Sequence, residues 1–444
     1  MRKSSTIIVQ EDENRPQTAF LIGIQHQGDS AEKAQELLDE LAELVATLEL
    51  PVVGSQVAKI RIPNPALIVG SGRADELAQE AAALGAEVII IDDFLTPAQQ
   101  RNWEKVTDLP VIDRQEVILD IFAARAHTSE AVLQVELAKA VYALPRLKRR
   151  WTHLSRQRGM AGGLGGRAEG EQQLEMDSRI VRNRIAKLKG QLAEVRQQRD
   201  VQRSKRLRKP VPVAAIVGYT NAGKSSLLNA LTQSSVLTED KLFATLDPTI
   251  RRLALPGGLD LLLGDTVGFI RKLPHLLVEA FKATLEETRL ADFIIEVLDA
   301  SSDSLDEHHQ TTLQVLQDIG IKNPPMIMVL NKCDLLSTPL QRQRLQRKYP
   351  EALLVSAQTG EGLPELLREL SVQVSAGMEQ LTVLIPHDRY DLISTIRKNC
   401  ALDSEKFIAE GVLLQLRAPL SCLSLLSAFV IPATADSALP SAMV

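Results

Sequence analysis

One segment limits the possible folds of this chain more than any other: Gly-Tyr-Thr-Asn-Ala-Gly-Lys-Ser, from Gly218 to Ser225. It follows residues 213–217, an apolar run that predicts a buried strand, and it leads into SSLLNALT, which predicts a helix. A strand, a glycine-rich loop and a helix in this order form the phosphate-loop arrangement. The segment therefore predicts an α/β domain that binds a nucleoside triphosphate.

Each residue type of this loop suits phosphate binding. Gly218 and Gly223 let the backbone approach the phosphates with its N–H groups, and the helix N-terminus adds a favourable dipole. We expect Lys224 to reach the β- and γ-phosphates and the Ser225 hydroxyl to bind Mg²⁺. The loop alone does not distinguish GTP from ATP.

A second motif predicts which base is bound. Residues 326–330 predict another buried strand, which ends in residues 331–334, Asn-Lys-Cys-Asp. The Asp334 carboxylate accepts hydrogen bonds only, so it matches the paired N–H donors of guanine, which adenine lacks. A later apolar run leads to residues 356–358, Ser-Ala-Gln, whose backbone amides can meet the guanine oxygen. The chain is therefore predicted to bind GTP and GDP, and an ATPase or kinase is disfavoured.

A third group of residues is expected at the γ-phosphate. Residues 259–263 predict a strand that runs into Asp265, which can hold Mg²⁺ through water, and the Gly268 amide can contact the γ-phosphate. A threonine between this strand and the phosphate loop can complete the magnesium shell only when the γ-phosphate is present. Thr245 and Thr249 are the two candidates, and Thr245 is favoured.

These motifs together define a predicted site. Lys224, Thr245 and Gly268 are the candidate catalytic residues, and Ser225 and Thr245 are the candidate metal ligands. The predicted GTP-binding residues are Gly218, Tyr219, Thr220, Asn221, Ala222, Gly223, Lys224, Ser225, Phe243, Ala244, Thr245, Leu246, Asp247, Asp265, Thr266, Val267, Gly268, Asn331, Lys332, Cys333, Asp334, Ser356, Ala357 and Gln358.

One residue departs from the Ras-like plan. Phe269 follows Gly268, where Ras-like enzymes carry a glutamine that orients water. Phenylalanine cannot do this, so we expect slow intrinsic hydrolysis that a partner accelerates. Asn221 lies where several glutamine-lacking GTPases coordinate K⁺, which could supply the missing positive charge. The alternative is that Asn221 only caps the loop.

The rest of the chain predicts three further parts. Residues 1–128 alternate apolar runs (18–25, 66–70, 87–92 and 109–113) with helical patterns such as 31–48, which predicts a largely parallel α/β domain. Residues 129–208 predict a helical hairpin, with helices over 129–150 and about 171–206 around a glycine-rich loop. Residues 209–372 form the P-loop domain, and 373–444 predict a small β-α-β segment, with strands at 381–386 and 411–418. His308 and His309 lie on a polar stretch and are expected at the surface.

The predicted hairpin has a heptad pattern and a strong positive charge. Leu174, Val181, Leu188 and Val195 are seven residues apart, and Ile185 and Leu192 form a second seam. Residues 146–209 contain 19 Lys and Arg against six Asp and Glu, a net charge of +13 in a chain of net −5. Such an arm suits a polyanion. The candidate RNA contacts are Arg150, Arg156, Arg158 and Arg167. A solvated coiled-coil face that binds a protein is the alternative.

The composition indicates the cellular compartment in which the protein is expected. The three cysteines lack metal-ligand spacing and suit a reducing compartment, so a cytoplasmic location is expected. The N-terminus lacks an apolar segment long enough for a signal peptide, and an apolar run of membrane-spanning length is not found. We expect a monomer.

The chain resembles the HflX family of GTPases, which associate with the ribosome. The resemblance covers about residues 18–372 and rests on residues 109–125 (LPVIDRQEVILDIFAAR), 133–139 (LQVELAK), 144–147 (LPRL), the loop GGLGGRAEGEQQLE at 162–175, FATLDPT at 243–249 and DTVGFI at 265–270. It implies binding to the large ribosomal subunit and its RNA, and a role in splitting or rescuing ribosomes under stress. The family usually has proline where this chain has Glu169, and this negative charge could weaken insertion of the loop into RNA.

Overall fold

The computed structural model describes residues 17–157, 165–206, 211–232, 242–243, 249–256, 259–271, 288–321, 324–376 and 378–431. The chain divides into two compact units. The first comprises the described residues up to Arg196 together with Leu242 and Phe243, and the second comprises the other described residues. The four-part division predicted from the sequence stays a prediction.

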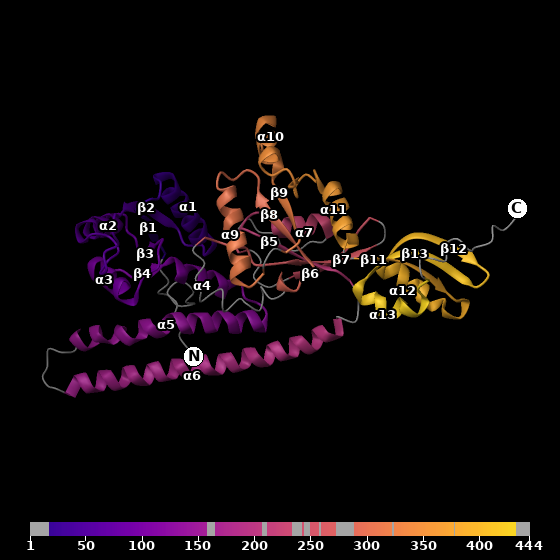
Figure 1. Cartoon of the computed structure of the whole chain (residues 1–444). Helices are drawn as coiled ribbons and strands as arrows, with labels where there is room; N and C mark the ends of the chain where they lie inside the picture. The colour runs from indigo at the N-terminus through magenta and orange to yellow at the C-terminus, as the bar shows by residue number, and fades with distance from the viewer. Residues whose placement is uncertain are drawn as a thin grey trace. The chain divides into compact units, whose positions relative to one another are not determined.

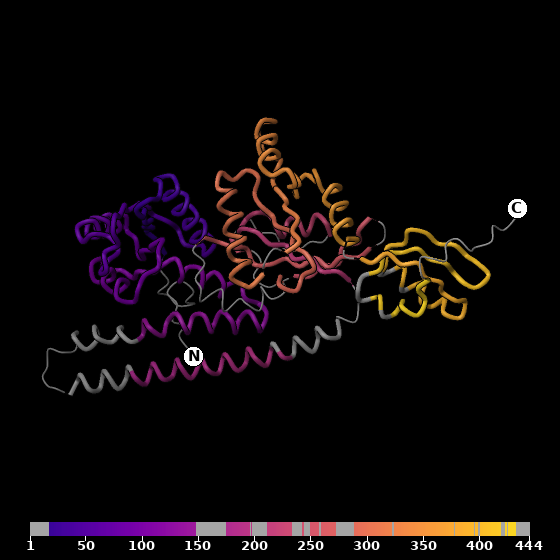
Figure 2. Tube along the Cα trace, viewed as in Figure 1, coloured from indigo at the N-terminus to yellow at the C-terminus, as the bar shows by residue number. Residues whose placement is uncertain are grey.

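The first unit contains a four-stranded parallel sheet in the order β2-β1-β3-β4. Its chain path can be followed in Figure 2. The elements are β1 (Ala19–Gln25), α1 (Ala31–Thr47), β2 (Val52–Lys59), α2 (Ser71–Ala83), β3 (Val88–Ile91), α3 (Pro97–Thr107), β4 (Val111–Asp113) and α4 (Arg114–Arg125). Every residue of β1, β3 and β4 is buried, as expected for parallel strands between helices. The predicted parallel α/β architecture is confirmed.

One of the four strands was misplaced by the sequence prediction. Residues 66–70 do not form a strand; Ile68 has a φ of 67°, and Trp103 Nε1 donates to the carbonyl oxygen of Leu67 at 2.8 Å. The apolar side chains of this loop are buried beneath α3 instead. The actual strand is β2, an edge strand of mixed polarity whose residues are mostly exposed or half-buried. Its pattern is weak because only one side of it meets the core.

Two long helices follow, the second of which belongs to the first unit up to Arg196, and they lie side by side in opposite directions (Figure 1). These are α5 (Ser129–Gln157) and α6 (Gly165–Arg206), joined in their described parts by an ion pair of 3.0 Å between Arg184 and Glu136. The second helix begins at Gly165, six residues before the predicted start, because glycine lowers helix propensity without preventing helix extension.

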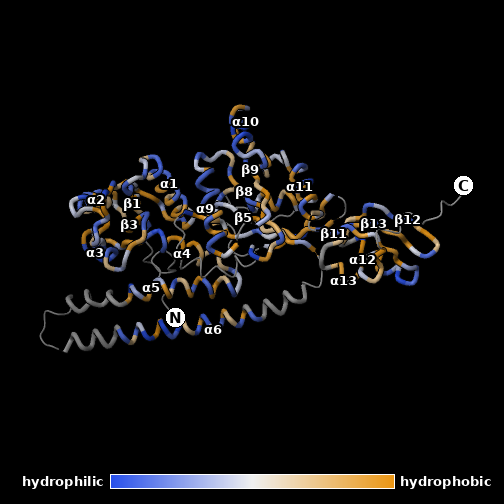
Figure 3. The backbone as a smooth tube through the Cα atoms, in the orientation of Figure 1, coloured by the Kyte–Doolittle hydropathy of each residue, from blue (hydrophilic) through white to orange (hydrophobic). Residues whose placement is uncertain are grey.

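The heptad pattern of α6 is visible in its burial. Leu188 and Leu192 are buried, and Val181, Ile185 and Val195 are half-buried. Orange and blue segments alternate along the coloured part of this helix in Figure 3. The side chain of Leu174 lies outside the described residues.

The second unit is built on a six-stranded sheet in the order β10-β9-β8-β5-β7-β6, in which only β6 runs antiparallel. Its strands are β5 (Val213–Gly218), β6 (Thr249–Ala254), β7 (Asp260–Asp265), β8 (Phe293–Asp299), β9 (Met326–Asn331) and β10 (Leu353–Leu354). Its helices are α7 (Lys224–Thr232), α9 (Leu305–Asp318), α10 (Pro339–Lys348) and α11 (Leu363–Ala376). The predicted P-loop α/β domain is confirmed.

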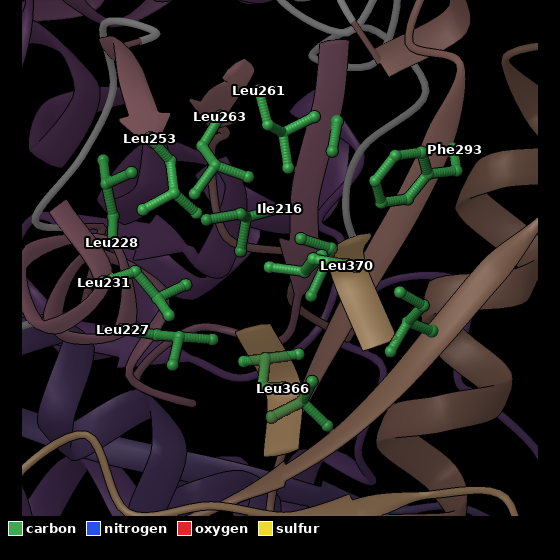
Figure 4. Packing of buried hydrophobic residues seen from close by; sticks show 14 of the residues in the cluster. Ile216, Leu227, Leu228, Leu231, Leu253, Leu261, Leu263, Phe293, Leu366 and Leu370 are labelled. Carbon is green, nitrogen blue, oxygen red and sulfur yellow. The ribbon is translucent and has the colours of Figure 1, made fainter. Parts of the chain in front are cut away.

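The core of this domain places the phosphate loop on a rigid base. Leucines of α7 and α11 pack against inward-facing residues of β5, β6, β7 and β8 (Figure 4). A second cluster on α9 contains Val315 and Leu316 and includes Phe269. Because β5 lies between β7 and β8 with all its residues but the first buried, its carboxyl end is held from both sides.

The chain ends in a small antiparallel sheet of three strands in the order β11-β13-β12. Its elements are β11 (Met378–Ile385), α12 (Asp391–Asn399), β12 (Ala401–Ile408), β13 (Gly411–Pro419) and α13 (Leu420–Leu426). The predicted β-α-β segment was incomplete, because β12 adds a strand. This strand has three charged residues and is largely half-exposed, so its pattern is that of a sheet edge.

Candidate functional site

The loop after β5 has a backbone that only glycine can adopt at two positions. Gly218 has a φ of 145°, and a Cβ there would lie 2.1 Å from the carbonyl oxygen of Val297. Gly223 has a φ of 86°, and its Cβ would lie 2.3 Å from Nδ2 of Asn331. The loop thus passes close to two neighbouring strand ends before α7 begins at Lys224. This geometry gives the tight turn that a phosphate-binding loop needs.

Lys224 is buried at the start of α7, at 7% exposure. Its Nζ donates to the carbonyl oxygen of Tyr219 at 2.7 Å, so the side chain folds back across its own loop. Burial lowers the pKa of Lys224 to about 8, and the nearby Asp265 carboxylate opposes this shift. A buried cation above a cradle of amides is suited to attract phosphate oxygens.

Two oxygen-bearing side chains meet beside the lysine. Ser225 Oγ donates to Asp265 Oδ2 at 2.6 Å, and Asp265 is fully buried at the end of β7. Thr266, the next residue, donates through Oγ1 to the carbonyl oxygen of Ile216 at 2.7 Å, which fixes the turn after β7. Hydroxyl and carboxylate oxygens are hard donors of the kind that Mg²⁺ prefers, so this pair fits a magnesium ion.

Gly268 lies directly against the phosphate loop. A Cβ at this position would lie 2.9 Å from Lys224 Nζ and equally close to Thr220 Cα, so no larger residue fits. The side chain of Phe269, in contrast, is 2% exposed and packs in the core with Val315 and Leu316 of α9. Residue 269 therefore cannot orient water as a glutamine does, because phenylalanine has no polar side-chain group and its ring is buried in the core.

The residues predicted to read the base come together at the ends of β9 and β10. Asn331 is 2% exposed; its Nδ2 donates to the carbonyl oxygen of Ala222 at 2.9 Å, and its Oδ1 accepts from the amide of Ala357 at 3.0 Å. One side chain thus joins the phosphate loop to the loop of residues 356–358. Lys332 has a φ of 61°, and its Nζ lies 2.8 Å from Asp299 Oδ2. Asp334 follows in a 3-10 turn and is half-buried.

Other predicted residues lie outside the described residues or in the first unit. Ala244, Thr245, Leu246 and Asp247 lie outside the described residues. Phe243 is 2% exposed and packs edge-on against Phe122 of α4, within the first unit, with ring centroids 4.7 Å apart. Of the candidate RNA contacts, Arg150 and Arg156 lie on α5, Arg167 lies on α6, and Arg158 is outside the described residues.

The sequence prediction also missed contacts around α9. His308 and His309 are half-buried, so their expected place at the surface was wrong. His308 stacks on Tyr219 at 3.8 Å between ring centroids, and His309 Nδ1 pairs with the fully buried Glu296 at 2.9 Å. The Glu296 interaction raises the pKa of His309. Glu296 is a single acidic residue within the apolar run of β8. An acid in a buried strand indicates that a polar partner lies nearby, and this was the available sequence signal.

Comparison with known proteins gives these motifs a family. Four family models match: "GTP-binding GTPase N-terminal" at 35–123, "GTP-binding GTPase Middle Region" at 125–206, "50S ribosome-binding GTPase" at 213–332 and "HflX C-terminal domain" at 342–421. A protein named GTPase HflX from Akkermansia muciniphila is 44% identical over 435 residues, which cover 95% of this chain and 99% of that protein. The chain belongs to the HflX family of GTPases.

A second relative agrees with this assignment. A GTPase HflX from Escherichia coli is 42% identical over 391 residues, 88% of this chain and 91% of that protein. A crystal structure of a GTP-binding protein from Sulfolobus solfataricus in complex with GDP is 25% identical, covers 81% of this chain and 99% of that chain, and has a TM-score of 0.41. The predicted resemblance is confirmed, and this family member binds GTP and hydrolyses it. Among the described residues, no helix is both long and apolar enough to cross a membrane.

Proposed function

We propose that this GTPase binds the large ribosomal subunit and its RNA, and that it splits or rescues ribosomes under stress. Two observations support the proposal. The family model that matches residues 213–332 is described as a 50S ribosome-binding GTPase. The helical arm carries the concentrated positive charge of the chain, +13 over residues 146–209. The charged arm carries the proposal, because RNA phosphates attract such a surface.

The base of this arm is fixed by a buried polar network within the first unit. Tyr142 of α5 donates to Asp113 Oδ1 at 2.9 Å, Arg146 Nη2 lies 3.1 Å from Asp113 Oδ2, and Lys139 Nζ lies 3.1 Å from Asp120. The Arg146 guanidinium also lies over the Tyr142 ring at 3.4 Å. A helix anchored on one face in this way can hold a charged extension in a defined direction.

The nucleotide roles remain proposals for individual residues. Lys224 would grip the β- and γ-phosphates, and the Gly268 amide would contact the γ-phosphate. Ser225 and Thr245 would hold Mg²⁺, which neutralises phosphate charge when bound. Residues 331–334 and 356–358 would read guanine, with Asp334 accepting from its N–H groups. Binding of the γ-phosphate would order the segment around Thr245 and so control affinity for RNA.

We infer that intrinsic hydrolysis is slow and that a partner accelerates it, because Phe269 is turned into the core. Asn221 has a φ of 58° and is exposed at the phosphate loop, a position from which its side chain could help hold K⁺. Equal GTPase rates in potassium and sodium buffers would remove potassium from the proposal. We also propose a cytoplasmic monomer.

Co-sedimentation with purified ribosomal subunits tests the main proposal. The chain is incubated with each subunit in GTP analogue, in GDP and without nucleotide. We expect association with the large subunit that depends on the nucleotide and weakens steeply with salt, with a log–log slope of several units. Lack of nucleotide-dependent association would refute the ribosome role and leave the GTPase activity intact.

A second function is a nucleotide-gated module whose arm binds a protein instead of RNA. The heptad seam of α6 favours it, since coiled-coil faces also serve protein contacts. Binding through a mainly apolar interface would change little between low and high salt. Co-sedimentation at increasing salt concentrations therefore distinguishes the two functions.

A further inference from the structure

Tyr219, the second residue of the phosphate loop, makes contacts that phosphate binding does not require. Its ring is 5% exposed, and its hydroxyl accepts a hydrogen bond of 2.8 Å from the backbone amide of Arg271. Its carbonyl oxygen accepts from Lys224 Nζ at 2.7 Å. One residue thus touches both the phosphate-gripping lysine and the segment that follows β7.

These contacts act on both sides of Gly268. Before it, Thr266 is tied to Ile216 of β5. After it, the amide of Phe269 donates to the carbonyl oxygen of Gly218 at 3.0 Å, and the amide of Thr220 donates to the carbonyl oxygen of Phe269 at 2.8 Å. The Tyr219 hydroxyl adds the last tie, at Arg271. Gly268 therefore lies beside Lys224, and hydrogen bonds hold the residues on both sides of it in place.

Helix α9 contacts both the Tyr219 ring and the Arg271 side chain. His308 stacks on the Tyr219 ring at an interplanar angle of 15°, and Glu307 lies 3.3 Å from the guanidinium of Arg271. Two consecutive residues of one helix thus position the tyrosine ring and the arginine that its hydroxyl contacts. The arginine side chain is 10% exposed and the glutamate side chain is 44% exposed, so only the arginine end of this pair is shielded from water.

We propose that Tyr219 is a positioning residue for GTP hydrolysis: its hydroxyl fixes Arg271, and through it the Gly268 amide, at the place where the γ-phosphate is contacted. This inference rests on the proposed role of Gly268. A donor fixed before the reaction stabilises developing charge without the cost of reorganising. GDP has no γ-phosphate, so its binding does not depend on this device. Loss of the hydroxyl therefore lowers the rate of hydrolysis and spares GDP affinity.

The test is Tyr219→Phe, which keeps the ring and its stack on His308 and removes only the hydroxyl. We expect kcat for GTP to fall about tenfold, since a buried amide loses its partner in the reactive arrangement. The dissociation constant for GDP stays within about twofold of the original value, since the phosphate grip is unchanged. The matched control is Tyr390→Phe, at an exposed tyrosine outside this domain's core, and it leaves both quantities unchanged.

Two more variants separate the possible failures. His308→Ala removes the stack but keeps the hydroxyl, and we expect a smaller fall in kcat, again without loss of GDP affinity. Gly268→Ala tests the proposed role of the glycine itself. If Gly268→Ala abolishes hydrolysis while Tyr219→Phe leaves kcat unchanged, the positioning role of Tyr219 is refuted and the glycine role survives. If Tyr219→Phe weakens GDP binding as much as it lowers kcat, the tyrosine is only structural and the inference is also refuted.

Discussion

The two large sheets of the molecule can be compared at the same edge, where their parallel strands reach their carboxyl ends. In the six-stranded sheet this edge carries the loop after β5, with glycine at 218 and 223 and the buried cation Lys224. The four-stranded sheet has the order β2-β1-β3-β4, in which the connection from β1 leads to one side of the sheet and the connection from β3 leads to the other. The strand order therefore also has a switch point between β1 and β3. Ligands of α/β proteins usually bind at such a point. The two edges therefore start from equivalent topology.

Their chemistry is opposite. Beside β1 and β3, Arg114 is fully buried and pairs with Asp92, at 2.7 Å, and with Glu40. His26, just after β1, lies 2.6 Å from Asp93, just after β3. The edge is thus occupied by the protein's own acid–base pairs. Acidic groups repel phosphate, whereas loop amides and a lysine attract it.

The next strand end continues the contrast. Asp113 caps α4 through the amide of Glu116 and accepts from Tyr142. Burial, reinforced by Asp120 and Asp113, raises the pKa of Glu116 to about 8. Burial therefore disfavours the charged form at both edges, on a carboxyl group in one and on an ammonium group in the other. The same fold supports a structural edge or a ligand-binding edge according to which charges the loops supply.

Arg114→Ala tests the structural edge and should give the largest effect. It removes the cation that pairs with the buried Asp92 and the half-buried Glu40, and breaking such a pair costs about 3–5 kcal/mol of unfolding free energy. Denaturant unfolding, followed by the fluorescence of buried Trp103, measures this loss. Arg73→Ala, which removes an exposed pair with Glu76, is the control and should change stability by less than about 0.5 kcal/mol. Unchanged stability in Arg114→Ala would mean that this edge is not held by its ion pairs.

Lys224→Ala tests the ligand-binding edge. Removal of a charge-assisted contact to phosphate costs about 2–3 kcal/mol, so the affinity for GDP should fall about a hundredfold. Calorimetry with GDP measures the change, and Lys105→Ala, at an exposed lysine of α3, should leave affinity unchanged. The two sheets would lose their contrast if Lys224→Ala bound GDP as tightly as the original chain.

The contrast also shows what the sequence can predict. The residues of the phosphate loop and of 331–334 are neighbours in the chain, and each group follows an apolar strand. Local spacing therefore predicted where they lie in the fold, and what each residue binds stays a prediction. Topology then brought them together through Asn331, whose two amide atoms bond Ala222 and Ala357.

The failures concern features that depend on distant partners. The run at 66–70 is as apolar as a strand, but its residues are buried by α3, more than 25 positions later. The pairing of His309 with Glu296 needs α9 to pack on β8, and the acid within the apolar strand signals only one of the two partners. The local sequence around Arg114 did not predict that the fold encloses this residue between two acids.

The pH dependence of GDP affinity sharpens the electrostatic part of the comparison. The pKa of Lys224 is lowered to about 8 without nucleotide, and phosphate charge must raise it. Below pH 8 the lysine is charged in both states, so affinity is flat. Above pH 8 binding must take up a proton, and affinity should fall about tenfold per pH unit. Calorimetry between pH 7 and 9 measures this. Lys224→Arg remains charged throughout, so its affinity, although weaker, should not follow this slope.

The smallest effect is expected at Arg342, because its ion pair is half-exposed. Arg342 of α10 pairs with Glu361 at 2.5 Å and donates to the carbonyl oxygen of Cys333 at 3.0 Å. Glu361 accepts from Cys333 Sγ at 3.5 Å. Unlike the pairs around Arg114, this bridge lies at the proposed guanine site, because it ties the turn that contains Cys333 to the loop that follows β10.

Arg342→Ala should therefore weaken GDP binding only about two- to fivefold, since exposed pairs contribute up to about 1 kcal/mol. The loss should appear as faster GDP release, measured with a fluorescent GDP derivative, because the turn that is proposed to hold guanine becomes looser. Arg342→Lys keeps the charge but cannot bridge Glu361 and Cys333 in the same way, so it should resemble the alanine variant. In Glu361→Gln the effect of Arg342→Ala should shrink, because the two residues act through one bridge. Additive effects of the two substitutions would show that Arg342 acts on the nucleotide by its charge alone. The bridge between Arg342 and Glu361 would then have no role in GDP binding.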